Sequence, residues 1–371
     1  MSYRLHRDES LPIGVRRIAH ELVDECIVLL DDPGDDVEEA VHEVRKFCKK
    51  LRGLLRLVRP SLGEAYRPAN VTFRDAARQI SSIRDAHALL ETFDDLVAAL
   101  HASGTDVRSI DDRDIGGAFL EVRGGLAARA SAASESVAEG DERIAAAREL
   151  IVEGSDQIDA WPLSNDVEVL KGGLAKTYRR GRRRLRECLF HPTDERLHQW
   201  RKRAKYTWYH LRLLGDAAPS VLQPLIGRFH DLSDVLGDDH DLAVLVAVLR
   251  DQPDEFGGDE AVETTVPVVE TVRKDLQQRA LRLGPRLYAE QAGAFATRVV
   301  AYWSAWQEHG DEWAAGEIAD LAPADDDLEE RSARQLYAIA RELNVPGRSG
   351  MDRDGLISSI RAAGWVAPAT T

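Results

Sequence analysis

An all-α fold is predicted by three features of this 371-residue sequence. Apolar residues recur at the spacing of one helix face through almost the whole chain. Alanine, leucine, arginine and glutamate dominate, and alternating β-branched runs bounded by turns are nearly absent. Because 44% of the residues are hydrophobic, a chain of this length can bury a sizeable core.

Proline and glycine mark the expected ends of the helices, because both destabilise a helix interior. We expect breaks at Asp32-Pro33-Gly34, near Pro60, at Gly104, near Trp161-Pro162, at His191-Pro192, near Pro219, at Gly257-Gly258 and at Gly284-Pro285. The acidic stretch 311–327, which contains Gly316 and Pro323, is interpreted as a linker to a short module.

The sequence also predicts where the protein resides. It contains no run of about 18 apolar residues, and its N-terminus lacks the apolar core of a signal peptide. We therefore expect a cytoplasmic protein that does not contact membranes. Cys26, Cys48 and Cys188 are an odd count without C-x-x-C spacing, so they are interpreted as buried apolar residues rather than disulfide or zinc cysteines.

The net charge of −15 conceals a strong segregation of charge. Residues 42–59 hold seven lysines or arginines against one acid, and residues 176–212 hold thirteen against three. These 55 residues carry +16, so the remainder sums to −31. The pattern predicts two local cationic surfaces on an otherwise acidic exterior.

An ungapped offset of 156 residues superposes two parts of the chain. Counting from His42, which aligns with His198, seven of 17 positions are identical. Four of the eight lysines occupy matched positions, namely Lys46, Lys49, Lys202 and Lys205. We interpret this as an internal duplication, with one helical repeat over residues 1–160 and a second over 161–310.

Each copy places its basic residues along one face of an amphipathic helix and its apolar residues on the other. Like charges at this spacing repel, so an anion is expected to offset them. The arginine-rich segment 179–186 is interpreted as a third cationic face, and Arg16 as a weaker contribution. The predicted anion ligands are His42, Arg45, Lys46, Lys49, Lys50, Arg52, Arg56, His198, Arg201, Lys202, Lys205, Arg212, Arg179, Arg182, Arg183 and Arg16.

Two histidines occupy matched positions among these cations. Fixed positive charges disfavour the imidazolium until an anion binds, and the charged ring then becomes another donor. The alternatives are a solvated basic face for any single charge run and, for His42, a neutral histidine at the edge of a bundle. The recurrence of the arrangement at His198 favours binding.

Asp85 and Asp241, also at matched positions, are expected to orient neighbouring basic side chains. Alternatively, Arg84-Asp85 and His240-Asp241 are halves of a metal-dependent phosphohydrolase site, which needs further ligands. The sequence contains no phosphate loop, dinucleotide fingerprint, nucleophile elbow or H-E-x-x-H motif. We therefore expect no catalytic residue, no metal and no cofactor.

The residues from His42 to Lys50, those from His198 to Lys205, and the later 83–85 and 236–241 resemble the CHAD family, a conserved histidine α-helical domain. The likeness covers about residues 5–310. It implies two pseudo-symmetric four-helix bundles around a cationic cavity that binds inorganic polyphosphate, often at polyphosphate granules. Trp208 and Gly215 replace basic residues of the first copy, so the surface departs from full symmetry.

The C-terminal residues 336–349 and 354–357 are similar to the small helix-loop-helix module at the N-terminus of transcription terminator Rho, which is related to SAP modules. We assign this module to residues 328–366. Such modules often contact nucleic acid, and a protein-contact or packing role is equally open.

The duplicated basic helices and the resemblance to the CHAD family make non-catalytic polyphosphate binding the leading hypothesis. The alternatives are nucleic-acid binding through the basic groove and this module, and a metal-dependent phosphohydrolase.

Overall fold

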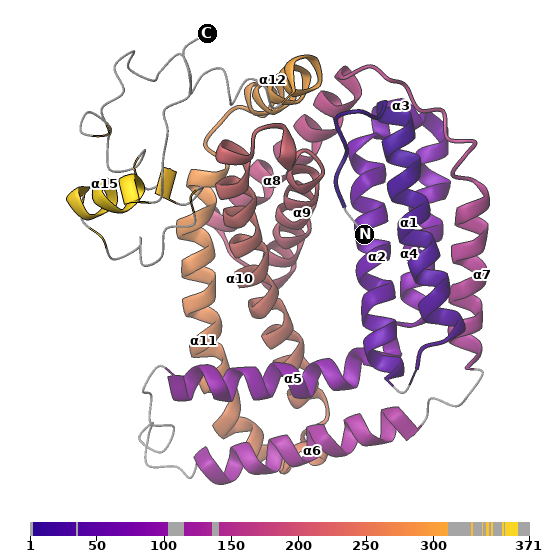
Figure 1. Cartoon of the computed structure of the whole chain (residues 1–371). Coiled ribbons are helices and arrows are strands. Elements are labelled where there is room, and N and C mark those ends of the chain that lie inside the picture. The colour runs from indigo at the N-terminus through magenta and orange to yellow at the C-terminus, as the bar shows by residue number, and fades with distance from the viewer. Residues whose placement is uncertain are drawn as a thin grey trace. The chain divides into compact units, whose positions relative to one another are not determined.

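The computed structural model describes residues 3–34, 36–102, 115–135 and 141–310, together with Leu328, Leu336, Ile339, Ala340, Leu343, Met351 and residues 353–362. All regular elements in these ranges are helices, which confirms the predicted fold class (Figure 1). The chain divides into two compact units, residues 1–308 and 309–371. Within the described ranges, no helix is long and apolar enough to span a membrane.

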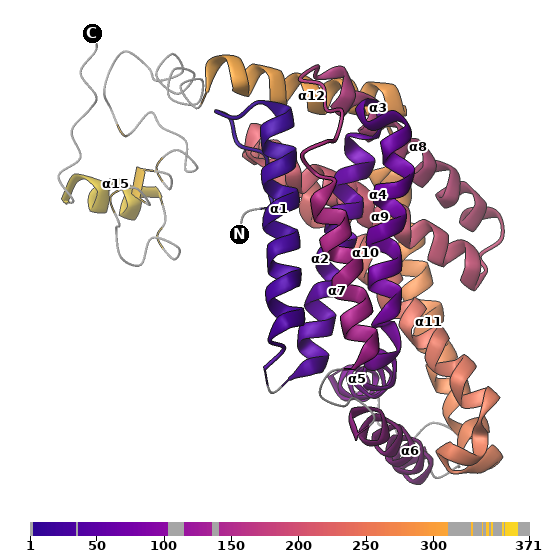
Figure 2. The same cartoon turned by 90° about the vertical axis from the view of Figure 1, so that its right-hand side faces the viewer.

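The first half of the larger unit contains a set of four helices that run nearly parallel (Figure 2). They are α1 (Leu11–Asp31), α2 (Val37–Leu57), α4 (Tyr66–Gln79) and α7 (Glu142–Asp156), with the short α3 (Arg59–Leu62) and η1 (Gly63–Ala65) between α2 and α4. Their apolar stripes bury residues such as Leu22, Leu51 and Phe73, as the periodicity requires. Cys26 and Cys48 are also buried here, and Cys188 is buried in the second half, as predicted.

The second half contains a further set of long helices. They are α8 (Glu168–Phe190), α9 (Asp194–Leu213), η3 (Gly215–Ala217), α10 (Pro219–Asp251), η4 (Pro253–Phe256), α11 (Gly258–Leu287) and α12 (Ala292–His309). Helix α10 packs against both α9 and α11, and α8 packs against α9. Helix α12 joins this core where the ring of Phe295 stacks on Tyr178, with centroids 4.0 Å apart.

The two halves differ at one bend. In the first half, α4 ends at Gln79 and α5 (Ser81–Ala102) leaves in a new direction, whereas α10 continues without interruption through the matched positions. Helices α5 and α6 (Ile115–Glu135) therefore run crosswise beneath the others and pack against α10 and α11 (Figure 1). This arm ties the first half to the second.

One expected helix break is wrong. Helix α11 passes through Gly284-Pro285 and ends at Leu287, so this proline lies within the last turn of a continuous helix. The reason for the glycine is close packing, because a Cβ at position 284 would lie 2.6 Å from the ring of Trp200. The expected break at Gly104 and the expected linker 311–327 lie outside the described residues.

The smaller unit has an apolar cluster of its own. Buried Leu328, Leu336 and Ala340 pack with Leu356, Ile357 and Ile360 of α15 (Arg353–Ala362). The regular i, i+1, i+4 spacing of the last three residues is typical of a helix that covers a small core.

A candidate anion-binding surface

Helix α2 carries the first cationic face because its start and its apolar stripe fix its orientation. The side chain of Asp36 accepts a hydrogen bond from the backbone N–H of Glu39 at 2.9 Å, which caps the helix. Val44, Cys48, Leu51 and Leu55 are buried on the opposite side. The basic side chains at positions 45, 46, 49, 52 and 56 are therefore held on the side that faces away from this core.

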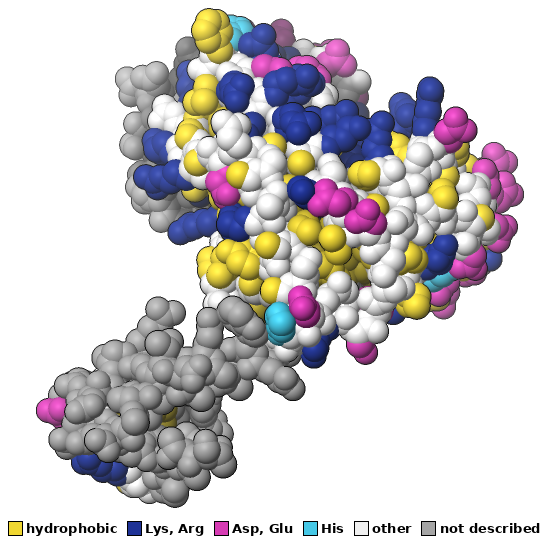
Figure 3. Space-filling view, turned by 90° about the horizontal axis from the view of Figure 1, so that it is seen from above, with side chains coloured by type: hydrophobic (Ala, Val, Ile, Leu, Met, Phe, Trp, Pro, Cys, Tyr) yellow, Lys and Arg dark blue, Asp and Glu magenta, His cyan; other side chains and the backbone are white. Residues whose placement is uncertain are grey.

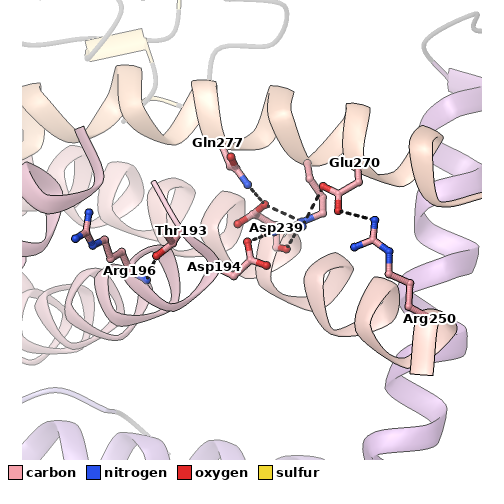
Figure 4. A network of polar contacts seen from close by, with 8 residues as sticks. Thr193, Asp194, Arg196, Asp239, Arg250, Glu270 and Gln277 are labelled. Atoms are coloured by element: carbon pink, nitrogen blue, oxygen red, sulfur yellow. Dashed lines mark hydrogen bonds and ion pairs between the residues drawn. The ribbon is translucent and has the colours of Figure 1, made fainter. Parts of the chain in front are cut away.

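Helix α9 carries the second cationic face and is fixed by a cap and by a buried ion-pair network (Figure 4). Thr193 caps the helix by accepting from the backbone N–H of Arg196 at 3.3 Å. Next to it, the buried guanidinium of Arg273 on α11 pairs with Asp194, with Asp239 at 3.3 Å and with Glu270 at 3.1 Å. This network holds the start of α9 against α10 and α11, one turn before His198.

The two cationic faces approach each other across the halves of the unit. Burial, the ammonium of Lys205 and the guanidinium groups of Arg45 and Arg201 lower the pKa of Lys49 to about 7. Burial and the charge of Arg201 likewise lower the pKa of Lys205. Through their ammonium groups, Lys49, Lys202 and Lys205 form no ion pair with any described residue. Cations from α2 and α9 therefore share one electrostatic environment that the protein's own carboxylates offset only in part.

An arginine of α8 and a further arginine of α9 add to this surface. The first lies in the segment 179–186 that the sequence predicts as a third cationic face, but neither is among the predicted ligands. Arg56 stacks on the ring of Tyr206 at 4.1 Å, and its pKa is lowered by burial and by the neighbouring Arg52 and Arg180. Burial, Arg180 and Arg56 also lower the pKa of Arg203. Arg180 on α8 and Arg203 on α9 thus belong to the cationic surface.

Helical phase, counted from a packing contact that the structure shows, identifies Arg180. Gly173 touches the backbone of Leu57, where an added Cβ would lie 1.7 Å from the carbonyl oxygen. Arg180 lies seven residues after this contact, which places it on the same face of α8.

Other residues that were predicted as ligands lie elsewhere. Arg182 donates to Gln291 at 2.8 Å, near the start of α12, and Arg179 and Arg183 lie on the exposed side of α8. Arg16 donates to the carbonyl oxygen of Trp161 at 2.8 Å within the first half. No contact among the described residues joins these four arginines to the surface formed by α2 and α9.

Both aspartates at matched positions contact the matched arginines. Arg45 lies 3.3 Å from Asp85 and also donates to the carbonyl oxygen of Ser81 at 3.0 Å. Arg201 lies 3.8 Å from Asp241 and passes beside Gly237, the position that matches Ser81. Each carboxylate offsets part of one guanidinium charge and restricts its orientation. Lys46 also pairs with a carboxylate, that of Glu43 on its own helix.

The two histidines flank the lysines on their respective helices. Burial and the charges of Arg84 and Lys49 lower the pKa of His42 to about 4. Burial, His240 and Lys202 lower the pKa of His198 to about 4, and its ring lies on that of His240 with centroids 3.9 Å apart. The Nδ1 atom of His198 is buried and has no hydrogen-bond partner in the described part of the chain. Both rings are therefore neutral near pH 7.

Lys50 and Arg212 extend the surface toward an aromatic cluster. Lys50 lies 4.8 Å from the ring centroid of Phe47, and Arg212 lies 5.1 Å from that of Trp208.

A space-filling view shows Lys and Arg side chains gathered across the upper part of the larger unit and acidic side chains along its right edge (Figure 3). In the described part of the chain, no three histidine, cysteine or carboxylate side chains are placed to hold a metal ion.

The family model of the CHAD domain matches residues 19–250, which is more than half of the chain. The chain belongs to the CHAD family. This confirms the resemblance inferred from the duplicated His-x-x-Arg-Lys-x-x-Lys pattern, and the CHAD domain is associated with polyphosphate binding. The match includes α2 and α9, which carry the two cationic faces, and α5 and α10, which carry the orienting Asp85 and Asp241. No curated protein matches the chain.

Proposed function

We propose that the larger unit binds inorganic polyphosphate, without catalysis, on the cationic surface formed by α2, α9 and Arg180. One observation carries this proposal. Lys49 is surrounded by Lys205, Arg45 and Arg201 and forms no ion pair with a carboxylate of the described residues, so its charged form is disfavoured in the free protein. A polyanion reverses this penalty, because each phosphate supplies the negative charge that the surface lacks.

The geometry suits a chain of closely spaced phosphates. Guanidinium groups donate bidentate, charge-assisted hydrogen bonds, and ammonium groups act as mobile point charges between them. The cations run along two helices, so one polyphosphate chain can contact basic side chains on several turns of each. Release of the counterions condensed on polyphosphate adds a driving force that falls as salt rises.

Nucleic acid is a weaker candidate for the same surface. Recognition of single strands usually requires exposed aromatic rings on which bases stack. Here Arg56 covers one face of Tyr206, Arg59 lies 4.3 Å from the ring of Tyr66, and Trp208 stacks on Tyr209. We therefore expect single-stranded DNA to compete poorly with polyphosphate at equal phosphate concentration.

The test is a titration of labelled polyphosphate with the full-length protein at several salt concentrations. We expect saturable binding whose association constant falls steeply with salt. Affinity that is insensitive to salt, or displacement by single-stranded DNA as efficiently as by unlabelled polyphosphate, would contradict the proposal. Incubation with Mg²⁺ and polyphosphate is expected to release no phosphate, and release would favour the phosphohydrolase alternative.

Three further expectations extend this proposal. The matched ion pairs of Arg45 and Arg201 support an internal duplication of one helical unit. We propose that polyphosphate binding brings the protein to polyphosphate granules. For residues 328–366 we retain a Rho-like or SAP-like module that contacts nucleic acid or protein.

A further inference from the structure

A large cavity lies beside the cationic surface, between the arm formed by α5 and α6 and the helices α10 and α11. Its volume is about 1080 Å³, slightly above the usual range of about 300–1,000 Å³ for small-molecule sites. Its floor is apolar, because buried Leu96, Leu242 and Leu276 line it. Four helices contribute residues to it, so the cavity exists only in the folded unit.

The rim of this cavity is acidic. Its charged lining residues are Asp95, Asp238, Asp241, Glu263, Asp275 and Arg279, five carboxylates against one guanidinium. Among the described residues, Asp95, Asp238, Glu263 and Asp275 form no ion pair, and neither does Arg279. Burial and the neighbouring carboxylates of Asp234 and Asp241 raise the pKa of Asp238. The site therefore has a surplus of negative charge that the protein does not neutralise.

We propose that this cavity binds an aliphatic polyamine such as spermidine. A polyamine alternates ammonium groups with short methylene chains, and the cavity is lined by both carboxylates and apolar side chains. The methylene groups cover the apolar floor while the ammonium groups pair with rim carboxylates. An inorganic cation satisfies the charge but leaves the floor exposed to water.

The polyamine site is separate from the polyphosphate surface, although the two adjoin. Asp241 lines the cavity and also lies 3.8 Å from Arg201 of the cationic surface. The rim carboxylates repel a polyanion, so polyphosphate does not enter the cavity. Binding of a polyamine can therefore be measured without polyphosphate, and its outcome does not depend on the proposed function.

The experiment is calorimetric titration of spermidine into the full-length protein at moderate salt, with no polyphosphate present. We expect saturable binding of one spermidine per chain. The triple variant D95N/E263Q/D275N should bind about tenfold more weakly, because it removes three of the rim charges. It leaves the contact between Asp241 and Arg201 intact.

A matched variant controls for the general attraction of cations to an acidic protein. Asp24, Glu64 and Asp156 are exposed, form no ion pair with the described residues and lie outside the cavity, so D24N/E64Q/D156N changes the net charge equally. We expect it to bind spermidine as the unmodified protein does. Equal losses in both triple variants, absence of saturable binding, or displacement of spermidine by an equal charge concentration of Mg²⁺ would overturn the proposal. Displacement of spermidine only by a basic peptide would overturn it in favour of a peptide groove.

Discussion

The buried imidazole of His210 on α9 lies with its Nε2 atom 3.0 Å from the carbonyl oxygen of Gly53 on α2. A carbonyl oxygen only accepts, so Nε2 carries the proton and donates. The approach is possible because residue 53 has no side chain, and a Cβ there would lie 3.1 Å from the ring of Tyr209. This hydrogen bond joins the two helices that carry the cationic faces.

Replacing His210 by alanine is expected to destabilise the protein by about 2–4 kcal/mol. The change removes the hydrogen bond, leaves the Gly53 carbonyl unsatisfied and opens a cavity in a fully buried position. Urea denaturation followed by circular dichroism measures the difference. The exposed His6 provides the control, because H6A should change the free energy of unfolding by less than about 0.5 kcal/mol.

The same histidine predicts how stability responds to acid. Burial lowers the pKa of His210 to about 3, below the reference value of 6.5. Between these values the unfolded chain takes up a proton and the folded protein does not, so stability is lost as pH falls from about 6.5 toward 3. The difference between the unmodified protein and H210A should therefore shrink by about 2 kcal/mol from pH 7 to pH 5. A difference that is constant over this interval would show that His210 is not buried in its neutral form.

The close contact between α8 and α2 predicts that a side chain at position 173 destabilises the protein. An alanine at position 173 would place its Cβ 1.7 Å from the carbonyl oxygen of Leu57, so the two helix backbones must separate. We expect G173A to cost about 3 kcal/mol of stability and to weaken polyphosphate binding by moving Arg180. The control is G124A on α6, where no atom of the described residues lies within 4 Å of the added Cβ. The higher helix propensity of alanine should stabilise this variant by up to about 1 kcal/mol. Equal thermal midpoints for the two variants would contradict the assigned contact.

Hydrophobic periodicity predicts which face of each helix is buried, but it does not predict which helices lie side by side. The spacing of Leu51, Leu55 and their neighbours predicts which side of α2 is buried, and therefore that Lys49 and Arg56 lie on the other side. The match of position 49 to 205 follows from the sequence offset alone. That these two lysines lie near each other depends on how α2 and α9 cross at Gly53, and this contact has no signature in a single sequence.

Helix α8 shows that a charge pattern alone does not identify the residues of a site. Its arginines at 179, 180, 182, 183, 184 and 186 spread over more than half of the helix circumference, so charge alone cannot select among them. The tight contact of Gly173 with Leu57 selects Arg180 and leaves Arg179 and Arg183 on the exposed side. Likewise, the acidic cavity requires the bend between α4 and α5, which no proline or glycine marks at Ile80-Ser81.

Removing two lysines tests the position of the polyphosphate surface. In K49Q/K205Q the loss of two facing ammonium groups should weaken polyphosphate binding by at least about tenfold and reduce its dependence on salt. R179Q/R183Q changes the net charge equally at two exposed arginines of α8, and its affinity should fall by less than about threefold. Equal losses in the two variants would indicate diffuse electrostatic attraction rather than a defined surface.

The pKa of Lys49 gives polyphosphate binding a specific pH dependence. In the free protein this pKa is about 7, because burial, Lys205, Arg45 and Arg201 disfavour the charged form and Asp241 opposes them only in part. Bound phosphate raises the pKa, so binding takes up a proton above pH 7 and affinity falls as pH rises from 7 to 9. Below pH 7 Lys49 is charged in both states and contributes no pH dependence.

Arginine at position 49 separates this effect from the other titrating groups. A guanidinium stays protonated throughout this range, so K49R should keep its affinity better than the unmodified protein does between pH 7 and pH 9. Lys171, which pairs with Glu168 at 2.9 Å at the start of α8, provides the control, and K171R should follow the unmodified protein. The K49R substitution preserves the positive charge but removes its titration. A pH profile of affinity parallel to that of the unmodified protein would therefore show that Lys49 does not gain a proton on binding. The Lys49 ammonium would then lie outside the phosphate contact.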